Sequence, residues 1–179
     1  MVRLITGGCR SGKSGYALDL VDKLEGQKIF LATCPKKQDD EMDDRIVRHQ
    51  KEREGLTQWT TLEEPLDLSS ILKKYHEEHI LIDCMTLWVS NWMYDAFKKE
   101  EKLTEEAVSE KLKEVLSMAR QRKGETVFVT NETGMGIVPE NDLAREFRDL
   151  IGRCNQVIGK DCDQLVMMVS GQPMFVKGS

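Results

Sequence analysis

The segment from Gly7 to Ser14 reads Gly-Gly-Cys-Arg-Ser-Gly-Lys-Ser, which is the G-x-x-x-x-G-K-S pattern of a phosphate-binding loop. Glycines let the backbone curl so that successive N–H groups point at phosphate oxygens, and the start of a helix adds partial positive charge. In such a loop Lys13 reaches the β- and γ-phosphates, and the Ser14 hydroxyl can bind Mg²⁺. An ordinary glycine-rich turn would not need the complete pattern directly after the apolar run at residues 2–6. The pattern therefore predicts that the chain binds a nucleoside triphosphate.

Two acidic residues follow predicted strands. Asp83 ends the apolar run Ile80-Leu81-Ile82, where an acid can hold Mg²⁺ beside the phosphate loop, usually through water. Glu132 follows the predicted strand at residues 127–130. Because ligands gather at the carboxyl ends of parallel strands, Glu132 should face the same site. There it could orient a nucleophile or bind metal, or it could equally cap the glycine-rich turn at residues 133–136.

A third candidate for chemistry is a histidine on a basic helix predicted over residues 39–53. Three residues on one face of that helix, spaced four apart, are Arg45, His49 and Arg53. Such a stripe would attract a polyphosphate, although composition alone favours a solvated basic face. The other two histidines, His76 and His79, lie near a predicted helix end, where histidine is usually solvated.

The composition limits the class of protein. A length of 179 residues fits one domain over residues 1–179 with a sizeable core. Lys and Arg number 26 against 31 Asp and Glu, a net charge of −5, which argues against a nucleic-acid surface. No apolar run has membrane-spanning length, and no signal peptide is expected. The five cysteines match no zinc spacing and suggest reduced thiols in a cytoplasmic protein. Cys9, inside the phosphate loop, either is oxidation-sensitive or simply fills a small position.

Strands and helices alternate along the chain, which predicts an α/β fold with a mainly parallel sheet covered by helices on both faces. Predicted strands span Val2–Thr6, Lys28–Thr33, Thr57–Thr61, Ile80–Cys84, Thr126–Thr130, Gln164–Ser170 and Met174–Lys177. Predicted helices span Lys13–Leu24, Asp39–Arg53, Leu66–Glu77, Thr86–Lys99, Thr104–Arg122 and Asn141–Lys160. The last strand follows a Ser-Gly-Gln-Pro turn signal and should return antiparallel. The charge run at residues 98–106 should be a solvated junction. Trp88 and Trp92 share a helix face and should pack in the core, unless they form an interface or an apolar ligand wall.

Several motifs along nearly the whole chain resemble the bifunctional adenosylcobinamide kinase / adenosylcobinamide-phosphate guanylyltransferase family of cobalamin biosynthesis. The matching segments are Gly7–Ser14, Ala32-Thr33, Asp39–Arg53, Trp59–Glu63, Asp83–Asn91, Thr130–Pro139, Arg145–Gln156 and Ser170–Pro173. The segments Thr130–Pro139 and the helix that carries His49 are the most specific of these.

The resemblance implies a RecA-like P-loop NTPase fold with three layers. It also implies that ATP or GTP phosphorylates adenosylcobinamide, after which GTP supplies GMP through a guanylylated histidine. His49 matches that nucleophile, with Arg45 and Arg53 positioned to offset developing charge. The implied nucleotide contacts are Gly8, Cys9, Arg10, Ser11, Gly12, Lys13, Ser14, Thr33, Cys34, Pro35, Gln50, Lys51, Glu52, Arg53, Glu63 and Asp83. Mg²⁺ would be bound by Ser14 and Asp83. Family members can be oligomeric, and the resemblance suggests a homotrimer.

The chain departs from the family pattern after the histidine. Glu54 follows Arg53 where proline is common, and Gly55-Leu56 look like extra residues directly after the segment at residues 50–53. Two other functions remain open. One is a P-loop small-molecule kinase without guanylyl transfer, and the other is a non-catalytic nucleotide switch.

Overall fold

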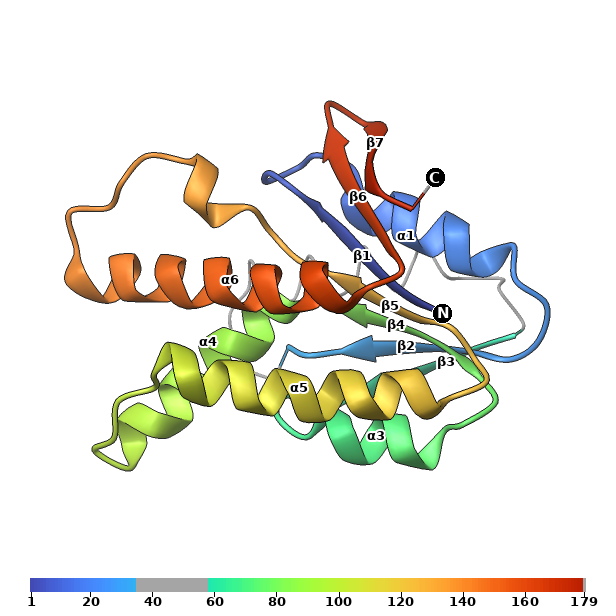
Figure 1. Ribbon diagram of the computed structural model, residues 1–179, viewed down its shortest axis with the longest axis horizontal. Helices are drawn as coiled ribbons and strands as arrows, with labels where there is room; N and C mark the ends of the chain where they lie inside the picture. The colour runs from blue at the N-terminus through green and yellow to red at the C-terminus, as the bar shows by residue number, and fades with distance from the viewer. Residues whose placement is uncertain (35–57, 179) are drawn as a thin grey trace.

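One sheet of seven strands forms the centre of the molecule, in the order β3-β2-β4-β5-β1-β6-β7 (Figure 1). The structure is a computed structural model that describes residues 1–34 and 58–178. The strands are β1 Val2–Gly7, β2 Lys28–Ala32, β3 Trp59–Glu63, β4 His79–Asp83, β5 Thr126–Val129, β6 Gln164–Val169 and β7 Gln172–Lys177. β1 to β6 run parallel and β7 pairs antiparallel with β6. The predicted α/β class and the antiparallel return of the last strand are confirmed.

Helices cover both faces of the sheet, so the molecule has three layers (Figure 1). They are α1 Lys13–Asp22, α3 Leu68–Lys74, α4 Met85–Lys98, α5 Glu105–Gln121, α6 Asp142–Asp161 and a short 3₁₀ turn, η1, Thr133–Met135. α1 packs through Ala17 and Val21 on one face, and α3 to α6 pack on the other. The helix predicted over residues 39–53 lies outside the described residues.

The faces of the sheet follow from strand alternation, since successive side chains point to opposite sides. In β4, Leu81 packs in the cluster that contains α1, while Ile80 and Ile82 pack with α3 to α6. All three are fully buried, which explains why β4 reads as a continuous apolar run. In β1 the same rule places Ile5 toward α1 and Leu4 toward the opposite helices.

Side-chain caps set the start of three helices. Asp67 accepts a hydrogen bond from the Ser70 N–H at 3.1 Å, and Thr104 and Asn141 cap α5 and α6 in the same way. The helix predicted from Leu66 to Glu77 is therefore shorter than expected. It starts after the Asp67 cap and ends before Tyr75, whose backbone has left the helical region.

Trp88 belongs to the core, as expected. It is 1% exposed and its indole Nε1 donates to the Leu66 carbonyl at 2.9 Å. The Trp92 ring packs against it with centroids 5.4 Å apart. The charge run after α4 is also a solvated junction, with Leu103 as its buried anchor.

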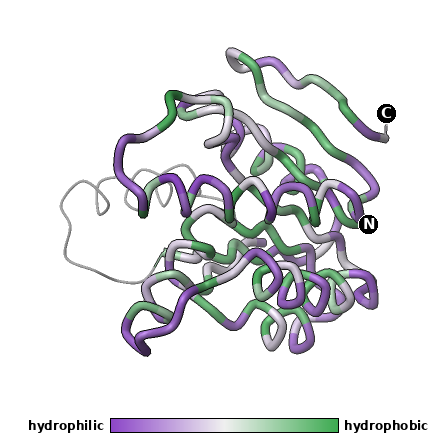
Figure 2. Tube along the Cα trace, turned by 60° about the vertical axis from the view of Figure 1, so that its left-hand side comes forward, coloured by the Kyte–Doolittle hydropathy of each residue, from purple (hydrophilic) through white to green (hydrophobic). Residues whose placement is uncertain are grey.

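The β6–β7 hairpin extends away from the helical layers (Figure 2). Every residue of β7 is exposed, including the apolar side chains of Met174, Phe175 and Val176. Its two-residue turn uses Ser170 and Gly171, both with positive φ, which is the backbone that a tight antiparallel hairpin requires. Within the described residues, no helix has the length and apolar content needed to cross a membrane.

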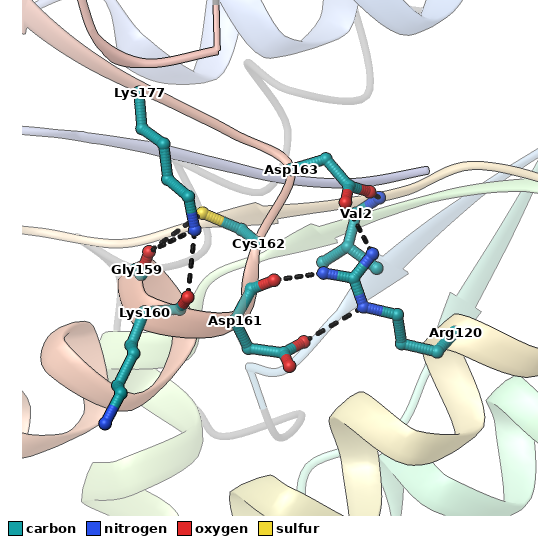
Figure 3. A network of polar contacts seen from close by, with 8 residues as sticks. All are labelled: Val2, Arg120, Gly159, Lys160, Asp161, Cys162, Asp163 and Lys177. Carbon is teal, nitrogen blue, oxygen red and sulfur yellow. Dashed lines mark hydrogen bonds and ion pairs between the residues drawn. The ribbon is translucent and has the colours of Figure 1, made fainter.

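Polar contacts fix the amino end of β1 against the start of β6 (Figure 3). The Val2 N–H donates to the Asp163 carboxylate at 2.7 Å, and the Asp163 N–H donates to the Val2 carbonyl at 2.8 Å. Arg120 donates to Asp163 at 2.5 Å and to Asp161 at 3.2 Å. Burial by itself would raise the pKa of Asp163, but the bonds from Arg120 and Val2 hold that pKa below its usual value.

A buried arginine joins three other segments at the same edge of the sheet. Arg122 is 6% exposed and donates to the Tyr75 carbonyl at 2.8 Å, to the Glu78 carbonyl and to the Thr126 hydroxyl. Burial lowers the pKa of Arg122 to about 10, so the guanidinium remains charged at neutral pH. This one side chain therefore ties the end of α5 to the starts of β4 and β5.

We expect Arg122→Ala to lower the free energy of unfolding by about 2–4 kcal/mol, because it leaves buried acceptors without a donor. The matched control is Lys123→Ala. Lys123 pairs with Glu77, and both side chains are largely exposed, so its loss should cost less than about 0.5 kcal/mol. Urea denaturation of both variants measures the difference. Equal midpoints would show that the Arg122 contacts contribute nothing to stability.

Candidate functional site

The phosphate loop connects β1 to α1 and requires glycine at two positions. At Gly7 a Cβ atom would lie 2.7 Å from both the Met168 carbonyl oxygen and the Ser11 Oγ, closer than any side chain tolerates. Gly12 has φ 91° and occupies the N-cap of α1. Arg10 also has positive φ, at 54°. These angles turn the chain so that the loop closes over the start of the helix.

Lys13 folds back across the loop it belongs to. Its Nζ donates to the Gly8 carbonyl at 3.0 Å, and the Ser11 N–H donates to the same carbonyl at 3.3 Å. The first turn of α1 holds no acidic residue, so its partial positive charge is not offset there. Residues 8–10 are exposed, and Ser14 lies half-buried in the first helical turn. The loop thus brings exposed backbone, an ammonium and a hydroxyl together at one place.

The C-terminal hairpin supports the loop from below. The Gly171 N–H donates to the Ser11 carbonyl at 3.0 Å. A Cβ atom added at Gly12 would lie 3.4 Å from the Gly171 Cα. Together with the Met168 carbonyl beneath Gly7, this contact makes the end of β6 the floor of the loop. No local sequence pattern indicates this role of the hairpin.

The ends of β2 and β4 are tied beside the loop. The Thr33 hydroxyl donates to the Cys84 carbonyl at 2.7 Å and accepts from the Cys84 N–H at 2.9 Å. Asn91 on α4 donates to the Thr33 carbonyl at 2.7 Å and to the Pro65 carbonyl at 3.0 Å. These bonds fix the backbone on the carboxyl side of Asp83, and the peptide bond between Asp83 and Cys84 is cis.

Cys84 is not a nucleophile of this site. Burial, and then the charge of the neighbouring Asp83, raise the pKa of the Cys84 thiol to about 12. The thiol is therefore protonated at neutral pH, and only the thiolate is reactive.

Glu132 is held at the carboxyl ends of β1 and β5. The Thr6 hydroxyl donates to its Oε1 at 2.6 Å, and the Asn155 amide on α6 donates to the same oxygen at 3.2 Å. The Glu132 N–H donates to the Gly7 carbonyl at 3.1 Å, directly at the start of the phosphate loop. The side chain makes no capping bond to the 3₁₀ turn that follows. The turn-capping alternative is therefore wrong, and Glu132 lies beside the first residue of the phosphate loop.

The two acids lie on different sides of the sheet edge. Asp83 follows Leu81 by two residues and so points to the face that carries α1, where Ser14 also lies. Thr6 follows Leu4 by two residues, so the Thr6–Glu132 contact is on the α6 side. β5 separates β4 from β1, which sets a spacing of roughly 10 Å between the two strands.

The structure places the predicted residues along one edge, although not all at one point. The loop from Gly8 to Ser14 follows β1, and Thr33 and Cys34 follow β2. Glu63 ends β3, and Asp83 ends β4. Strand β3 lies four strand positions from β1, on the order of 19 Å across the sheet. Pro35, His49 and the run Gln50, Lys51, Glu52 and Arg53 lie outside the described residues.

The other two histidines lie at the opposite edge. His79 begins β4, and both its ring nitrogens are bonded: Nδ1 accepts from the Glu125 N–H at 3.0 Å, and Nε2 contacts the Glu25 carbonyl at 2.9 Å. The His79 side chain is half-buried, and both ring nitrogens have protein partners in place of solvent alone. His76 is exposed beside Glu77. Four residue steps along β4 separate His79 from Asp83, on the order of 13 Å.

A family model described as cobinamide kinase / cobinamide phosphate guanyltransferase matches residues 3–176. The chain belongs to this family. The bifunctional adenosylcobalamin biosynthesis protein CobU of Escherichia coli (strain K12) is 34% identical, with 99% of this chain and 100% of the relative covered. The bifunctional adenosylcobalamin biosynthesis protein CobP of Pseudomonas aeruginosa is 36% identical, with 98% and 96% covered. The resemblance drawn from the sequence motifs is thereby confirmed.

Among solved structures, the fold is similar to a prototypical ATPase of the type III secretion system of pathogenic bacteria. The TM-score is 0.61 at 13% identity, over 93% of this chain and 50% of that one. This likeness concerns the fold alone. With the parallel sheet and the loop between β1 and α1, it confirms the predicted RecA-like P-loop class for this member of the cobinamide kinase family.

Bound nucleotide should protect Cys9 from alkylation, because Cys9 is exposed in the phosphate loop. At a nucleotide concentration ten times Kd, the rate of reaction with iodoacetamide should fall about tenfold, in proportion to the unbound fraction. Peptide mapping by mass spectrometry measures that rate. Cys154 and Cys162 are internal controls, since both are buried and burial raises the pKa of each thiol. An unchanged rate at Cys9 would show that nucleotide does not cover the loop.

Proposed function

We propose that this protein phosphorylates the aminopropanol hydroxyl of adenosylcobinamide with ATP or GTP, and then transfers GMP from a second GTP to give adenosylcobinamide-GDP. The observation that carries the proposal is the complete phosphate loop at the carboxyl edge of the sheet, in a chain that matches the kinase / guanyltransferase family over residues 3–176. The chain also spans its curated relatives nearly end to end, which supports assigning it both activities.

In the kinase step the loop binds the triphosphate through its N–H groups, and Lys13 offsets charge at the β- and γ-phosphates. The donor set fits Mg²⁺, which prefers oxygen ligands and uses one or two carboxylates together with substrate phosphates. Ser14 and Asp83 supply a hydroxyl and a carboxylate on the same face of the sheet. When bound, Mg²⁺ would neutralise charge on the phosphates, and the protein's part is to hold these two oxygen ligands in place.

In the transfer step, we assign the nucleophile to His49. A neutral imidazole can attack the α-phosphorus of GTP and release pyrophosphate, and the phosphoramidate then passes GMP to the phosphorylated corrinoid. The positions of the other histidines support this assignment. His76 and His79 lie at the edge of the sheet opposite the phosphate loop, and His79 has both ring nitrogens engaged.

The remaining residue assignments follow the family resemblance. Nucleotide contacts are proposed for Gly8, Cys9, Arg10, Ser11, Gly12, Lys13, Ser14, Thr33, Cys34, Pro35, Gln50, Lys51, Glu52, Arg53, Glu63 and Asp83. Thr33 is fully buried and its hydroxyl is bonded to Cys84, so its side chain serves mainly to position the end of β4. We also propose a homotrimer and a cytoplasmic location. The odd number of cysteines fits no disulfide framework, which supports a reducing compartment.

Lys13→Ala should reduce phosphorylation of adenosylcobinamide by about 10²-fold or more, because it removes a cation where charge shifts during transfer. The assay uses saturating ATP and detects adenosylcobinamide phosphate. Lys23→Ala is the matched control, since Lys23 is an exposed lysine at the other end of α1. Near-normal turnover in Lys13→Ala would show that the loop is not the kinase site.

His49→Ala should abolish covalent labelling by α-labelled GTP while leaving the kinase step active, because alanine offers no nucleophile. In the wild type the label should be acid-labile and alkali-stable, as a phosphoramidate is. His76→Ala, which removes an exposed histidine, is the control and should label normally.

The same labelling experiment separates the competing functions. Kinase activity in a wild type that takes up no label would favour a small-molecule kinase without guanylyl transfer. Nucleotide binding with neither turnover nor label would favour a non-catalytic switch. Loss of both activities in folded His49→Ala would place the histidine in the kinase site.

A further inference from the structure

We propose that Glu132 accepts the proton of the attacking hydroxyl in the kinase step, with Thr6 and Asn155 as its positioning residues; this inference rests on the proposed function. The substrate class is an alcohol that attacks the γ-phosphorus of a nucleoside triphosphate. No other acid of the described residues is tied by its backbone to the first residue of the phosphate loop.

Glu132 lies beside the phosphate loop because its own backbone is bonded to the loop. The Glu132 N–H is bonded to the Gly7 carbonyl at 3.1 Å, and the next carbonyl of the loop, that of Gly8, binds the Lys13 ammonium at 3.0 Å. Lys13 marks the place of the β- and γ-phosphates. The acid and the cation therefore flank the same turn, where an acceptor that attacks the terminal phosphate must approach.

The Glu132 carboxylate is held through one of its two oxygens. Both of its side-chain donors, the Thr6 hydroxyl at 2.6 Å and the Asn155 amide at 3.2 Å, bind the same oxygen, Oε1. Asn155 is itself oriented, because its Nδ2 also donates to the Asn131 carbonyl at 2.9 Å and its Oδ1 accepts from the Thr130 hydroxyl at 2.7 Å. Two elements, β1 and α6, thus fix one oxygen of Glu132.

Among the described residues, no hydrogen bond reaches the second carboxylate oxygen, and the side chain is half-buried. An acid with one oxygen anchored and the other without a hydrogen bond to the described residues can accept a proton at that second oxygen.

The resulting step balances. The hydroxyl oxygen of the acceptor forms a bond to the γ-phosphorus, and the bond from that phosphorus to the β,γ-bridging oxygen breaks. The nucleoside diphosphate leaves with the bonding electron pair. The proton of the hydroxyl goes to the open oxygen of Glu132. Lys13 stays on the phosphate side throughout, so the two charged groups have separate tasks.

The test compares Glu132→Gln with Glu140→Gln. Glutamine keeps the shape and an acceptor oxygen for Thr6 and Asn155 but does not take a proton at neutral pH. Glu140 is an exposed acid on the same loop, and its side chain makes no hydrogen bond to the described residues, so it is the matched control. We expect kcat of the kinase step to fall about 10²–10⁴-fold in Glu132→Gln, with KM for ATP within about threefold of wild type. Glu140→Gln should remain at the wild-type rate.

Two further readouts exclude a merely structural role. The acid limb of the wild-type pH profile of kcat/KM should disappear in Glu132→Gln, and guanylyl transfer to supplied adenosylcobinamide phosphate should stay normal. Asn155→Ala should lower kcat by a smaller factor and add little when combined with Glu132→Gln, since both act through the same carboxylate.

Three results would overturn the proposal: near-wild-type kinase activity in Glu132→Gln, equal loss of both reactions, or a raised Mg²⁺ requirement, which would make Glu132 a metal ligand. If the wild type itself phosphorylates no cobinamide, the proposed function fails instead. The comparison then uses ATP hydrolysis with water as the acceptor. A lower rate in Glu132→Gln than in Glu140→Gln would still support proton acceptance, and equal rates would contradict it.

Discussion

The parallel pairing of β5 with β1 is the constraint on which the site depends, because the chain after the end of β5 stays bonded to the last residues of β1. The Thr130 N–H donates to the Ile5 carbonyl at 3.0 Å, and the Glu132 N–H donates to the Gly7 carbonyl at 3.1 Å. The phosphate loop and the acid are therefore parts of one hydrogen-bond ladder. A slip of one residue in this pairing would turn Thr6 and its neighbours to the wrong faces, and the contact between Thr6 and Glu132 would be lost.

The phosphate loop also depends on close contacts between backbone segments. Gly7 has the Met168 carbonyl beneath it, and Gly12 has the Gly171 backbone beside it. The β6–β7 hairpin thus supports the loop even though β7 itself is the exposed edge strand of the sheet (Figure 1). The C-terminal strands support the phosphate loop through backbone contacts, and they contribute no charged group to it.

Much of the fold could be predicted from the sequence, because buried parallel strands read as short apolar runs and the phosphate loop fixes the order of strand, loop and helix. What failed depends on contacts between distant segments. His79 is bonded by Glu25 and Glu125, far from it in sequence, so a local pattern could not show these contacts. The same holds for Glu132, whose orientation is set by Asn155 on α6. Asn155 stood within a family motif, but nothing local linked it to an acid 23 residues earlier.

The two edges of the sheet use polar groups in opposite ways. At the amino edge, the buried Arg122 finds acceptors on three segments, and Asp163 is held by Arg120 and Val2. These groups are satisfied within the protein, so they serve stability. At the carboxyl edge, residues 8–10 of the loop are exposed, and one oxygen of Glu132 has no hydrogen bond to the described residues. Incomplete pairing there is what leaves room for a phosphate and an alcohol, and the rigid opposite edge allows the fold to tolerate it.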